Sequence, residues 1–295
     1  MGKLNRKSKV ALLSVTSNSI LIILKIVAGV LSGSVSIISE AIHSGMDLVA
    51  SIIAFFSVMT SSKPADRQHP YGHGKIENIS GAIEGLLIFV AAGMIIFEAV
   101  KKIIEPGEIE QAYVAIAVML TSAVVNFFVS RKLYKTGKEE DSMALEADAL
   151  HLKTDIYTSL GVGVGILLIT LTGFTRLDSM VAILVAMLII KEAWVLCKNA
   201  IEYLMDVKLT DEEEQEIEEI IKTYSGKIID YHKLKTRKSG SVRHIDFHIT
   251  LDSDLTVKEA HDIVGCFKKD IGKKFTAARV NVHIDPYKND EKSIH

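Results

Sequence analysis

Two histidine–aspartate pairs with the same spacing stand inside long apolar stretches of the sequence. His43 and Asp47 are four residues apart, and His151 and Asp155 repeat that spacing. Side chains four residues apart share one face of a helix, so each stretch presents an imidazole beside a carboxylate. If the two faces meet, they form a site of two His and two Asp. That ligand set suits a tetrahedral borderline metal such as Zn2+, and its carboxylates cancel the charge of the ion.

A simpler explanation is that each pair is a hydrogen bond between packed helices. Polar contacts between membrane helices are common, and a single pair would favour that reading. The second copy makes that reading less favourable, because placing each ionisable side chain at the centre of a bilayer costs roughly 2.5–3.5 kcal/mol of free energy. Four such groups need a compensating partner, and we therefore predict an intramembrane metal site on a substrate pathway.

Six hydrophobic runs must position these residues. They cover residues 9–31, 35–61, 76–103, 111–134, 142–172 and 177–204, and each reaches the ~20 residues that cross a bilayer. The first run is too long for a signal peptide, lacks an A-x-A site and is followed by further runs. The sequence therefore predicts a polytopic protein whose residues 1–206 form six transmembrane helices.

Lysine and arginine predict the orientation of these helices. Basic residues gather before the first run, in the second loop and in the fourth loop: Lys3, Arg6, Lys7, Lys9; Lys63, Arg67, Lys75; Arg131, Lys132, Lys135, Lys138. The alternate loops hold Lys101, Lys102 and Arg176. By the positive-inside rule, both termini face the cytoplasm.

Residues 207–295 form a second, charged region. They hold 33 of the charged residues, against 37 in the first 206. Acidic residues after Thr210 indicate a helix start. Alternating strands near 228–237 and 242–251, a helix near 256–274 and a strand near 278–285 follow. The order αββαβ predicts a small α+β domain with ferredoxin-like connectivity.

The predicted strands of this domain place metal ligands on one face. His244, Asp246 and His248 alternate along one strand, and His283 and Asp285 share a face of the last strand. The two polar faces can adjoin. We interpret His244 as a solvated residue and leave it out of the predicted site.

Composition excludes several other classes of protein. A net charge of −2 and a pI of about 6.6 argue against a nucleic-acid partner, which requires a basic face. A hydrophobic content of 48% excludes a disordered chain. Cys197 and Cys266 lie far apart without a CxxC motif, so neither a disulfide scaffold nor a thiolate cluster is expected.

Several motifs together resemble the cation diffusion facilitator family. They are the two HxxxD pairs, the loop sequence D-R-Q-H-P-Y-G-H-G-K over residues 66–75, the segment A-D-A-L-H over residues 147–151, and the histidine-bearing domain after them. The resemblance covers nearly the whole chain. It implies a homodimeric, proton-coupled exporter of divalent metals in a lipid bilayer, not an enzyme.

The resemblance carries over to individual residues. His43, Asp47, His151 and Asp155 match the transport site of the family, and the His/Asp–His/Asp form is similar to that of zinc-selective members. Many bacterial members have Asp at the position of His43, and manganese exporters have an Asn or Asp pattern there. Zn2+ is therefore the expected substrate, with Co2+, Cd2+, Fe2+ or Mn2+ as alternatives.

The resemblance also implies further metal sites. One is the loop set Asp66, His69 and His73, for which a solvated, turn-rich connector is the alternative. The other is a zinc cluster at the dimer interface of the domain 207–295, in which Zn2+ would be structural or regulatory: His232, His248, His261, His283 and Asp285. An interlock between Lys75 and Asp206 is also suggested, against the alternative of ordinary flanking charges.

The ligand chemistry predicts the mechanism. Zn2+ requires neutral imidazoles and ionised carboxylates, so metal and protons compete for the same side chains. No nucleotide-binding motif is present, which predicts proton-driven export. An intramembrane metalloprotease would need HExxH, which is absent, and a non-transporting metal sensor differs only in flux. The compact loops fit a multi-pass protein of a bacterial inner membrane.

Overall fold

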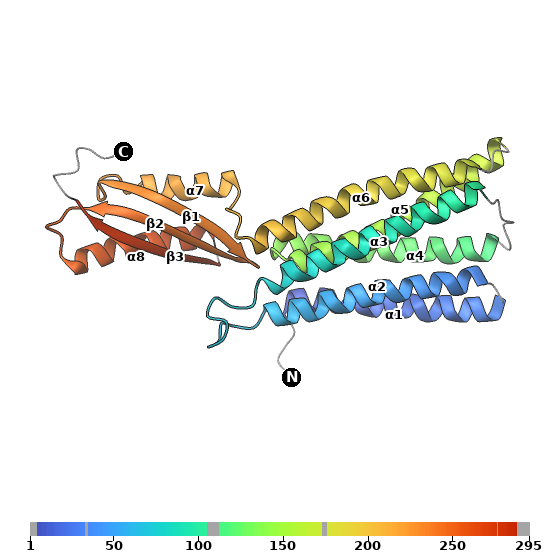
Figure 1. The fold of residues 1–295 in the computed structure, drawn as a ribbon. Coiled ribbons are helices and arrows are strands. Elements are labelled where there is room, and N and C mark those ends of the chain that lie inside the picture. Colours follow the sequence, from blue (N-terminus) through green and yellow to red (C-terminus); the bar gives the residue numbers. More distant parts are fainter. Residues whose placement is uncertain (1–4, 33–34, 105–111, 173–175, 276, 288–295) are drawn as a thin grey trace. The chain divides into compact units, whose positions relative to one another are not determined.

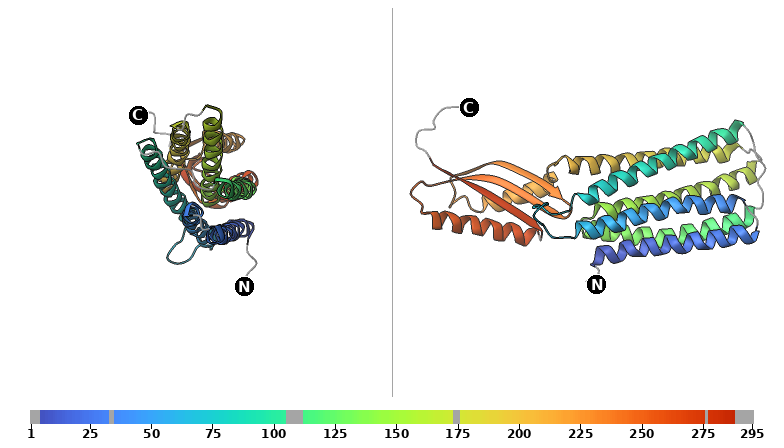
Figure 2. Two further views of the ribbon diagram at one scale, coloured as in Figure 1. Left: turned by 90° about the vertical axis from the view of Figure 1, so that its right-hand side faces the viewer. Right: turned by 60° about the horizontal axis from the view of Figure 1, so that its bottom comes forward.

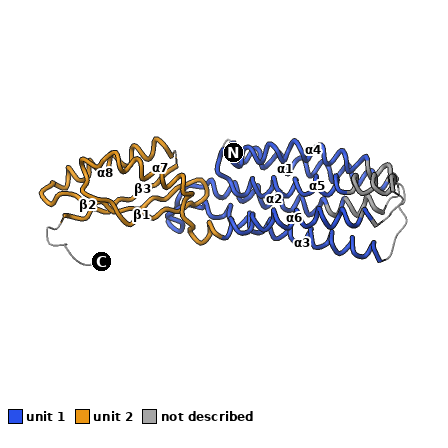
Figure 3. The backbone as a smooth tube through the Cα atoms, turned by 90° about the horizontal axis from the view of Figure 1, so that it is seen from above, with its two compact units in different colours: residues 1–201 blue, residues 202–295 orange. Residues whose placement is uncertain are grey.

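The chain separates into two compact units, residues 1–201 and 202–295 (Figure 3). The computed structural model describes residues 5–32, 35–104, 112–172, 176–275 and 277–287. Within the helices, the side chains of several residues also lie outside this description, among them those of 35–40, 42–43 and 162–172. Each unit is described by itself below.

Unit 1 consists of six long helices that run side by side (Figures 1 and 2). They are α1 (Arg6–Ser32), α2 (Val35–Ser61), α3 (Ile76–Ile104), α4 (Ala112–Glu139), α5 (Met143–Thr172) and α6 (Arg176–Leu204). Their bounds lie within a few residues of the hydrophobic runs, because apolar side chains and helical hydrogen bonding favour the same segments in a bilayer.

Four of these helices are long and apolar enough to cross a membrane, judged over the described residues. The spans are Arg6–Ala28, Ser44–Ser61, Ile76–Ile104 and Ser179–Leu204. Parts of α4 and α5 lie outside the described side chains. That all six helices cross the bilayer therefore stays a prediction.

The helices of unit 1 bury polar side chains beside two apolar clusters and expose many large apolar side chains on the outside. Large apolar groups such as Phe97 and Phe128 are 72% and 66% exposed. In the interior, Asp47, Glu84 and Asp148 are buried. Buried carboxylates together with an exposed apolar surface differ from a water-soluble bundle and suit a protein covered by lipid.

Unit 2 has the element order α7 (Asp211–Lys222), β1 (Asp230–Ser239), β2 (Val242–Leu251), α8 (Val257–Lys274) and β3 (Ala278–Pro286). This αββαβ order agrees with the expected one. The strands form one sheet in the order β1-β2-β3, with β1 antiparallel and β3 parallel to β2. Thr210 caps α7, and Thr256 forms a capping box with Glu259 at α8.

Both helices of unit 2 pack on one face of its sheet. Ile245, Phe247 and Ile249 point to that face from β2 and are at most 1% exposed. They pack with Ile217 of α7 and Phe267 of α8 in one buried cluster. Because side chains alternate along a strand, the even-numbered residues of β2 face the other side of the sheet.

Helices α3 and α6 approach each other closely at a glycine. A Cβ atom built on Gly85 would collide with Sγ of Cys197. The thiol also lies 3.8 Å from the carbonyl oxygen of Ala82. Small residues allow such close packing of membrane helices.

We predict that Gly85→Ala destabilises unit 1 by about 1–3 kcal/mol, because the added methyl group overpacks this contact. Fluorescence of Trp194, the single tryptophan of the chain, measures the loss as a lower melting temperature. Adding Cys197→Ala should restore the melting temperature. Gly93→Ala, which meets no atom within 4 Å, is the control, and an equal loss there would contradict the packing argument.

Candidate metal centres

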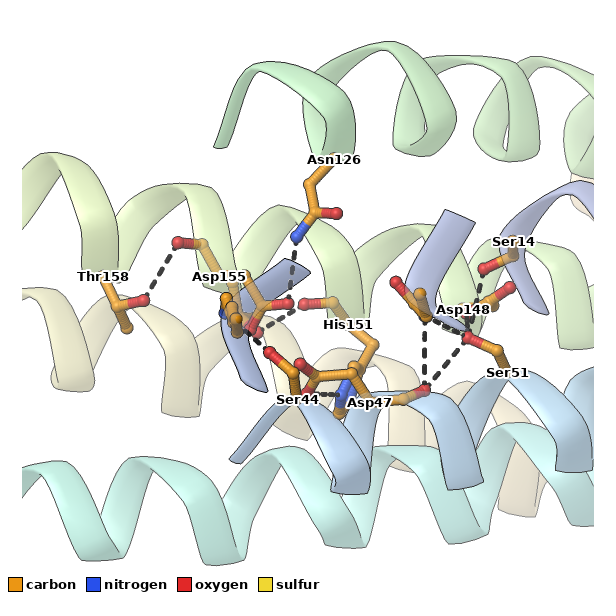
Figure 4. Close-up of polar contacts among 12 residues, drawn as sticks. Ser14, Ser44, Asp47, Ser51, Asn126, Asp148, His151, Asp155 and Thr158 are labelled. Carbon is orange, nitrogen blue, oxygen red and sulfur yellow. Dashed lines mark hydrogen bonds and ion pairs between the residues drawn. The ribbon is translucent and has the colours of Figure 1, made fainter. Parts of the chain in front are cut away.

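The first candidate site joins α2 and α5 inside unit 1. Nε2 of His151 lies 3.0 Å from Oδ1 of Asp47 (Figure 4). Both side chains are buried, at 5% and 6% exposure. One member of each HxxxD pair is therefore in direct contact with a member of the other, although the two lie 104 residues apart in the chain.

This contact is a hydrogen bond of ordinary length, and the separation of its two atoms is also compatible with two ligands of one metal ion. Two ligands at about 2.0–2.1 Å from a tetrahedral ion lie about 3.3 Å from each other. The 3.0 Å between the Asp47 and His151 atoms is close to that separation. Nδ1 of His151 is buried and has no hydrogen-bond partner among the described residues. A buried ring nitrogen without a partner is unusual for a purely structural histidine.

Of the other two predicted ligands, Asp155 has a described side chain and His43 does not. Asp155 follows His151 by one turn of α5, and its Oδ2 accepts a hydrogen bond of 3.3 Å from Asn126 of α4. His43 belongs to α2, but its side chain lies outside the described residues. The neighbouring Ser44 is described, and its hydroxyl lies 2.6 Å from Nζ of the buried Lys25.

The second candidate site is the loop between α2 and α3. Nδ1 of His69 lies 3.3 Å from Asp66 Oδ1, and Nε2 of His73 lies 3.5 Å from Asp66 Oδ2. One ligand atom from each of the three residues falls within 4.8 Å of the others. The backbone N–H of His69 donates to Asp66 and holds the pKa of that carboxyl below its usual value.

The loop bends to bring these three residues together. Gly72 has a φ of +90°, which favours glycine, and its N–H donates to the carbonyl oxygen of His69. His73 is 13% exposed in its side chain, whereas Asp66 is half exposed. Three protein ligands at a partly exposed site leave room for water on an ion.

The third candidate site is a row of histidines across the sheet of unit 2. In register, His232 of β1 lies opposite His248 of β2, and His248 lies beside His283 of β3. Asp285 follows two residues after His283 and therefore shares its face. All four belong to the sheet face that α7 and α8 leave uncovered.

Asp285 connects the histidines of this row. Its Oδ2 lies 2.9 Å from Nδ1 of His248 and 3.3 Å from Nε2 of His232. Its Oδ1 lies 3.3 Å from Nε2 of His283. The contact with His248 is the main cause that holds the pKa of Asp285 below its usual value. A β-bulge between His232 and Lys235, with Lys233 at a φ of +53°, shapes this end of β1.

His261 does not join this cluster within one chain. It lies on α8, its side chain is 83% exposed, and it is 3.8 Å from Asp262. Its predicted role as a ligand therefore requires a second copy of the chain.

The interpretation of His244 as a solvated residue is wrong. Its side chain is buried, at 5% exposure, because it lies in register between Arg237 of β1 and Arg279 of β3. Burial, followed by the charges of Arg237 and Arg279, lowers the pKa of His244. Nη1 of Arg237 lies 3.2 Å from Oδ1 of Asp206, also within unit 2.

Three polar residues around the first site were missed in the sequence. Asn126 binds Asp155, Ser44 binds Lys25, and Ser51 donates to the carbonyl oxygen of Asp47 at 3.0 Å. The sequence could have indicated Asn126 as a site residue, because a buried amide inside the apolar run 111–134 needs a hydrogen-bond partner there. The serines could not be recognised from the sequence, since a serine in a helix can donate its hydroxyl to a backbone carbonyl of the same helix and needs no other partner.

Comparison with known proteins matches both units. The family model of the cation efflux transmembrane domain covers residues 11–205. The chain belongs to the cation efflux family. The model of the cytoplasmic domain of cation efflux proteins covers residues 209–287. The resemblance to cation diffusion facilitators is thus confirmed, and the protein is a membrane transporter of divalent metals by family.

Relatives extend over almost the whole chain. The manganese efflux system protein MneP of Bacillus subtilis is 33% identical over 287 residues, 95% of this chain and 96% of its own length. The cation-efflux pump FieF of Shewanella oneidensis is 30% identical over 273 residues, 92% of both chains. An uncharacterized transporter of Synechocystis is 34% identical over 272 residues, 92% of this chain and 88% of its own.

We predict that Asp285→Asn weakens Zn2+ binding at the histidine row at least tenfold. Loss of an outer partner of a metal ligand already costs about 10–100-fold, and Asp285 contacts all three histidines. Competition with a chelating dye measures the affinity, in a full chain that also carries Asp47→Asn and Asp66→Asn to remove the other sites. Asp254→Asn, an exposed carboxyl near α8, is the control. Unchanged affinity in the Asp285 variant would show that Asp285 is no ligand.

The lowered pKa of His244 predicts an acid-sensitive unit 2. The unfolded chain takes up a proton near the ordinary pKa of 6.5, while the folded chain resists it, so stability is fully present above that value and falls as pH drops below it. In the full chain, with a chelator present, the protection factors of β2 amides (exchange rates corrected for the pH dependence of intrinsic exchange) should fall from pH 7 to 5. His244→Gln should remove most of this dependence, whereas the exposed His261→Gln should retain it.

Proposed function

We propose that this protein exports Zn2+ from the cytoplasm in exchange for protons, through a site made by His43, Asp47, His151 and Asp155. The family membership supports divalent-metal transport, and the contact between Asp47 and His151 carries the proposal for the site. It joins the two HxxxD motifs inside a bundle whose outer surface is apolar. Co2+, Cd2+, Fe2+ and Mn2+ are the alternative substrates, and one relative is named for manganese.

The proton coupling follows from the ligands. A carboxylate and an imidazole bind an ion only when they carry no extra proton, so each proton that binds Asp47 or His151 weakens the hold on the metal. An ion loaded from the cytoplasm is then released where protons are abundant. The proton gradient supplies the free energy, and the reaction needs no nucleotide.

The orientation and assembly are part of the proposal. The basic residues of the N-terminal segment and of two loops favour cytoplasmic termini in a bacterial inner membrane. The cytoplasmic domain supports a homodimer, in which the histidine row of one chain and His261 of a second copy would bind Zn2+ together. Metal that binds the docked dimer more tightly than the free domains favours the docked state.

The loop set of Asp66, His69 and His73 is proposed as a weaker, partly solvated site. Its three ligand atoms support binding, and its exposure leaves positions on the ion to water. Such a site suits transient binding.

The test is Zn2+ uptake into inverted vesicles or proteoliposomes that hold the protein. We expect an interior-acid pH gradient to accelerate uptake and an ionophore that collapses the gradient to slow it. Asp47→Asn and Asp155→Asn should each reduce the rate at least a hundredfold, because each removes a charged ligand from a buried ion.

Glu98→Gln on the exposed side of α3 is the matched control and should leave the rate unchanged. Transport that is indifferent to the gradient, or undiminished in both aspartate variants, would overturn the mechanism. Binding of Zn2+ without any flux would instead identify a membrane metal sensor.

A further inference from the structure

A buried lysine of α1 is not among the proposed ligands. Lys25 lies within the apolar span Arg6–Ala28, and it is 6% exposed. Of the lysines and arginines whose side chains the structure describes, Lys25 alone is buried. Its Nζ donates a hydrogen bond of 2.6 Å to Oγ of Ser44 on α2. Lysine inside a membrane span is costly, and such residues most often belong to a substrate pathway.

Lys25 belongs to a line of polar contacts between α1 and α2. On α1, Ser14, Asn18 and Lys25 follow one another at spacings of four and seven residues, so they share one face of the helix. On α2, the hydroxyl of Ser51 lies 3.1 Å from that of Ser14 and 2.5 Å from the amide nitrogen of Asn18. Ser44 precedes Ser51 by seven residues and receives Lys25. The face of α1 that carries Lys25 is therefore packed against one face of α2.

This face of α2 also carries the proposed ligand Asp47. Asp47 follows Ser44 by three residues, and Cβ atoms with that spacing on a helix are about 5–6 Å apart. The amide nitrogen of Asn18 lies 3.4 Å from the carbonyl oxygen of Asp47. Figure 4 shows the side chains of Ser44 and Asp47 on the same side of α2, toward His151. The ammonium group of Lys25 thus lies on the order of 10 Å from the carboxylate of Asp47.

The charge of the proposed transport site changes when it binds metal. Ionised Asp47 and Asp155 give the metal-free site two negative charges, which the two charges of a bound Zn2+ cancel. The ammonium group of Lys25 attracts the carboxylates in the first state and repels the ion in the second. At the effective dielectric constant of a protein interior, such interactions are substantial over about 10 Å. Lys25 therefore stabilises the metal-free site relative to the metal-bound site.

We propose that the ammonium group of Lys25 is a tethered counter-ion of the transport site. It takes no ligand position and acts on the ion through its charge, while the hydrogen bond to Ser44 holds it in place. It lowers the affinity for the metal, which allows the ion to leave, and it balances one of the two carboxylates when the carrier returns without metal. The inference rests on the proposed function, because it takes Asp47 and Asp155 as the charged ligands.

The experiment measures the affinity of the full chain for Zn2+ in lipid nanodiscs, by competition with a chelating dye. Asp66→Asn and Asp285→Asn are present throughout to remove the other sites. Lys25→Met keeps the length of the side chain and removes its charge, so it should lower the dissociation constant at least tenfold. A unit charge about 10 Å from a divalent ion changes binding by more than that at an effective dielectric constant of about 20.

Lys9→Met is the matched control. It removes the same charge from the exposed side of α1, about 24 Å along the helix from Lys25, and should leave the affinity unchanged. Ser44→Ala removes the hydrogen bond but keeps the ammonium group, so it should change the affinity much less than Lys25→Met. If Lys25→Met does not fold, as judged by Trp194 fluorescence, Lys25→Gln provides the same comparison and keeps a donor for Ser44.

An unchanged or weaker affinity in Lys25→Met would overturn the inference and leave Lys25 a structural contact between α1 and α2. Equal tightening in Lys9→Met or Ser44→Ala would also overturn it, since a neighbouring charge would then not be the cause. Asp47→Asn in the same background tests the site itself and should abolish binding. Binding that persists there would refute the transport site, and the inference with it. Binding that is lost there but does not tighten in Lys25→Met refutes the inference alone.

Discussion

A charge buried among membrane helices must be balanced inside the protein, since neither lipid nor water is available to balance it. The interior of unit 1 concentrates carboxyl groups, with Asp47, Glu84 and Asp148 all buried. Many large apolar side chains face outward, while smaller apolar clusters pack beside the buried polar groups. The bundle is held in this arrangement by helix packing and by serine and asparagine hydrogen bonds.

Unit 2 has a different architecture, a sheet with helices on one face only. Its helices cover one sheet face and form an apolar core around Phe247 and Phe267. This rigid layer leaves the other face free to present His232, His248 and His283 at one register level. Histidines that are fixed on neighbouring strands would lose little conformational entropy on binding an ion, as the proposed metal site requires.

Spacing and hydropathy in the sequence predicted a large part of this arrangement. The HxxxD repeat predicted that α2 and α5 face each other, and the contact between Asp47 and His151 agrees with it. Alternation along the strands predicted a shared face for His283 and Asp285. The burial of His244 could not be foreseen, because it depends on the strand register that places Arg237 and Arg279 beside it. Likewise, it depends on the three-dimensional packing that Oε2 of Glu84 and Oδ2 of Asp148 have no hydrogen-bond partner among the described residues, since no local rule says which side chains reach them.

The register of β3 has a consequence for how the chain folds. β1 and β2 form a local hairpin, but β3 follows only after the whole of α8. A slip of β3 by one residue would turn His283 and Asp285 to the opposite face, among the apolar side chains. The hairpin alone supplies His232 and His248, and the other two proposed ligands, His283 and Asp285, arrive together when β3 docks in its native register. If the hairpin bound an ion before β3 docks, only the native register of β3 would add His283 and Asp285 as further ligands, so the ion would stabilise the correctly docked sheet over misaligned ones.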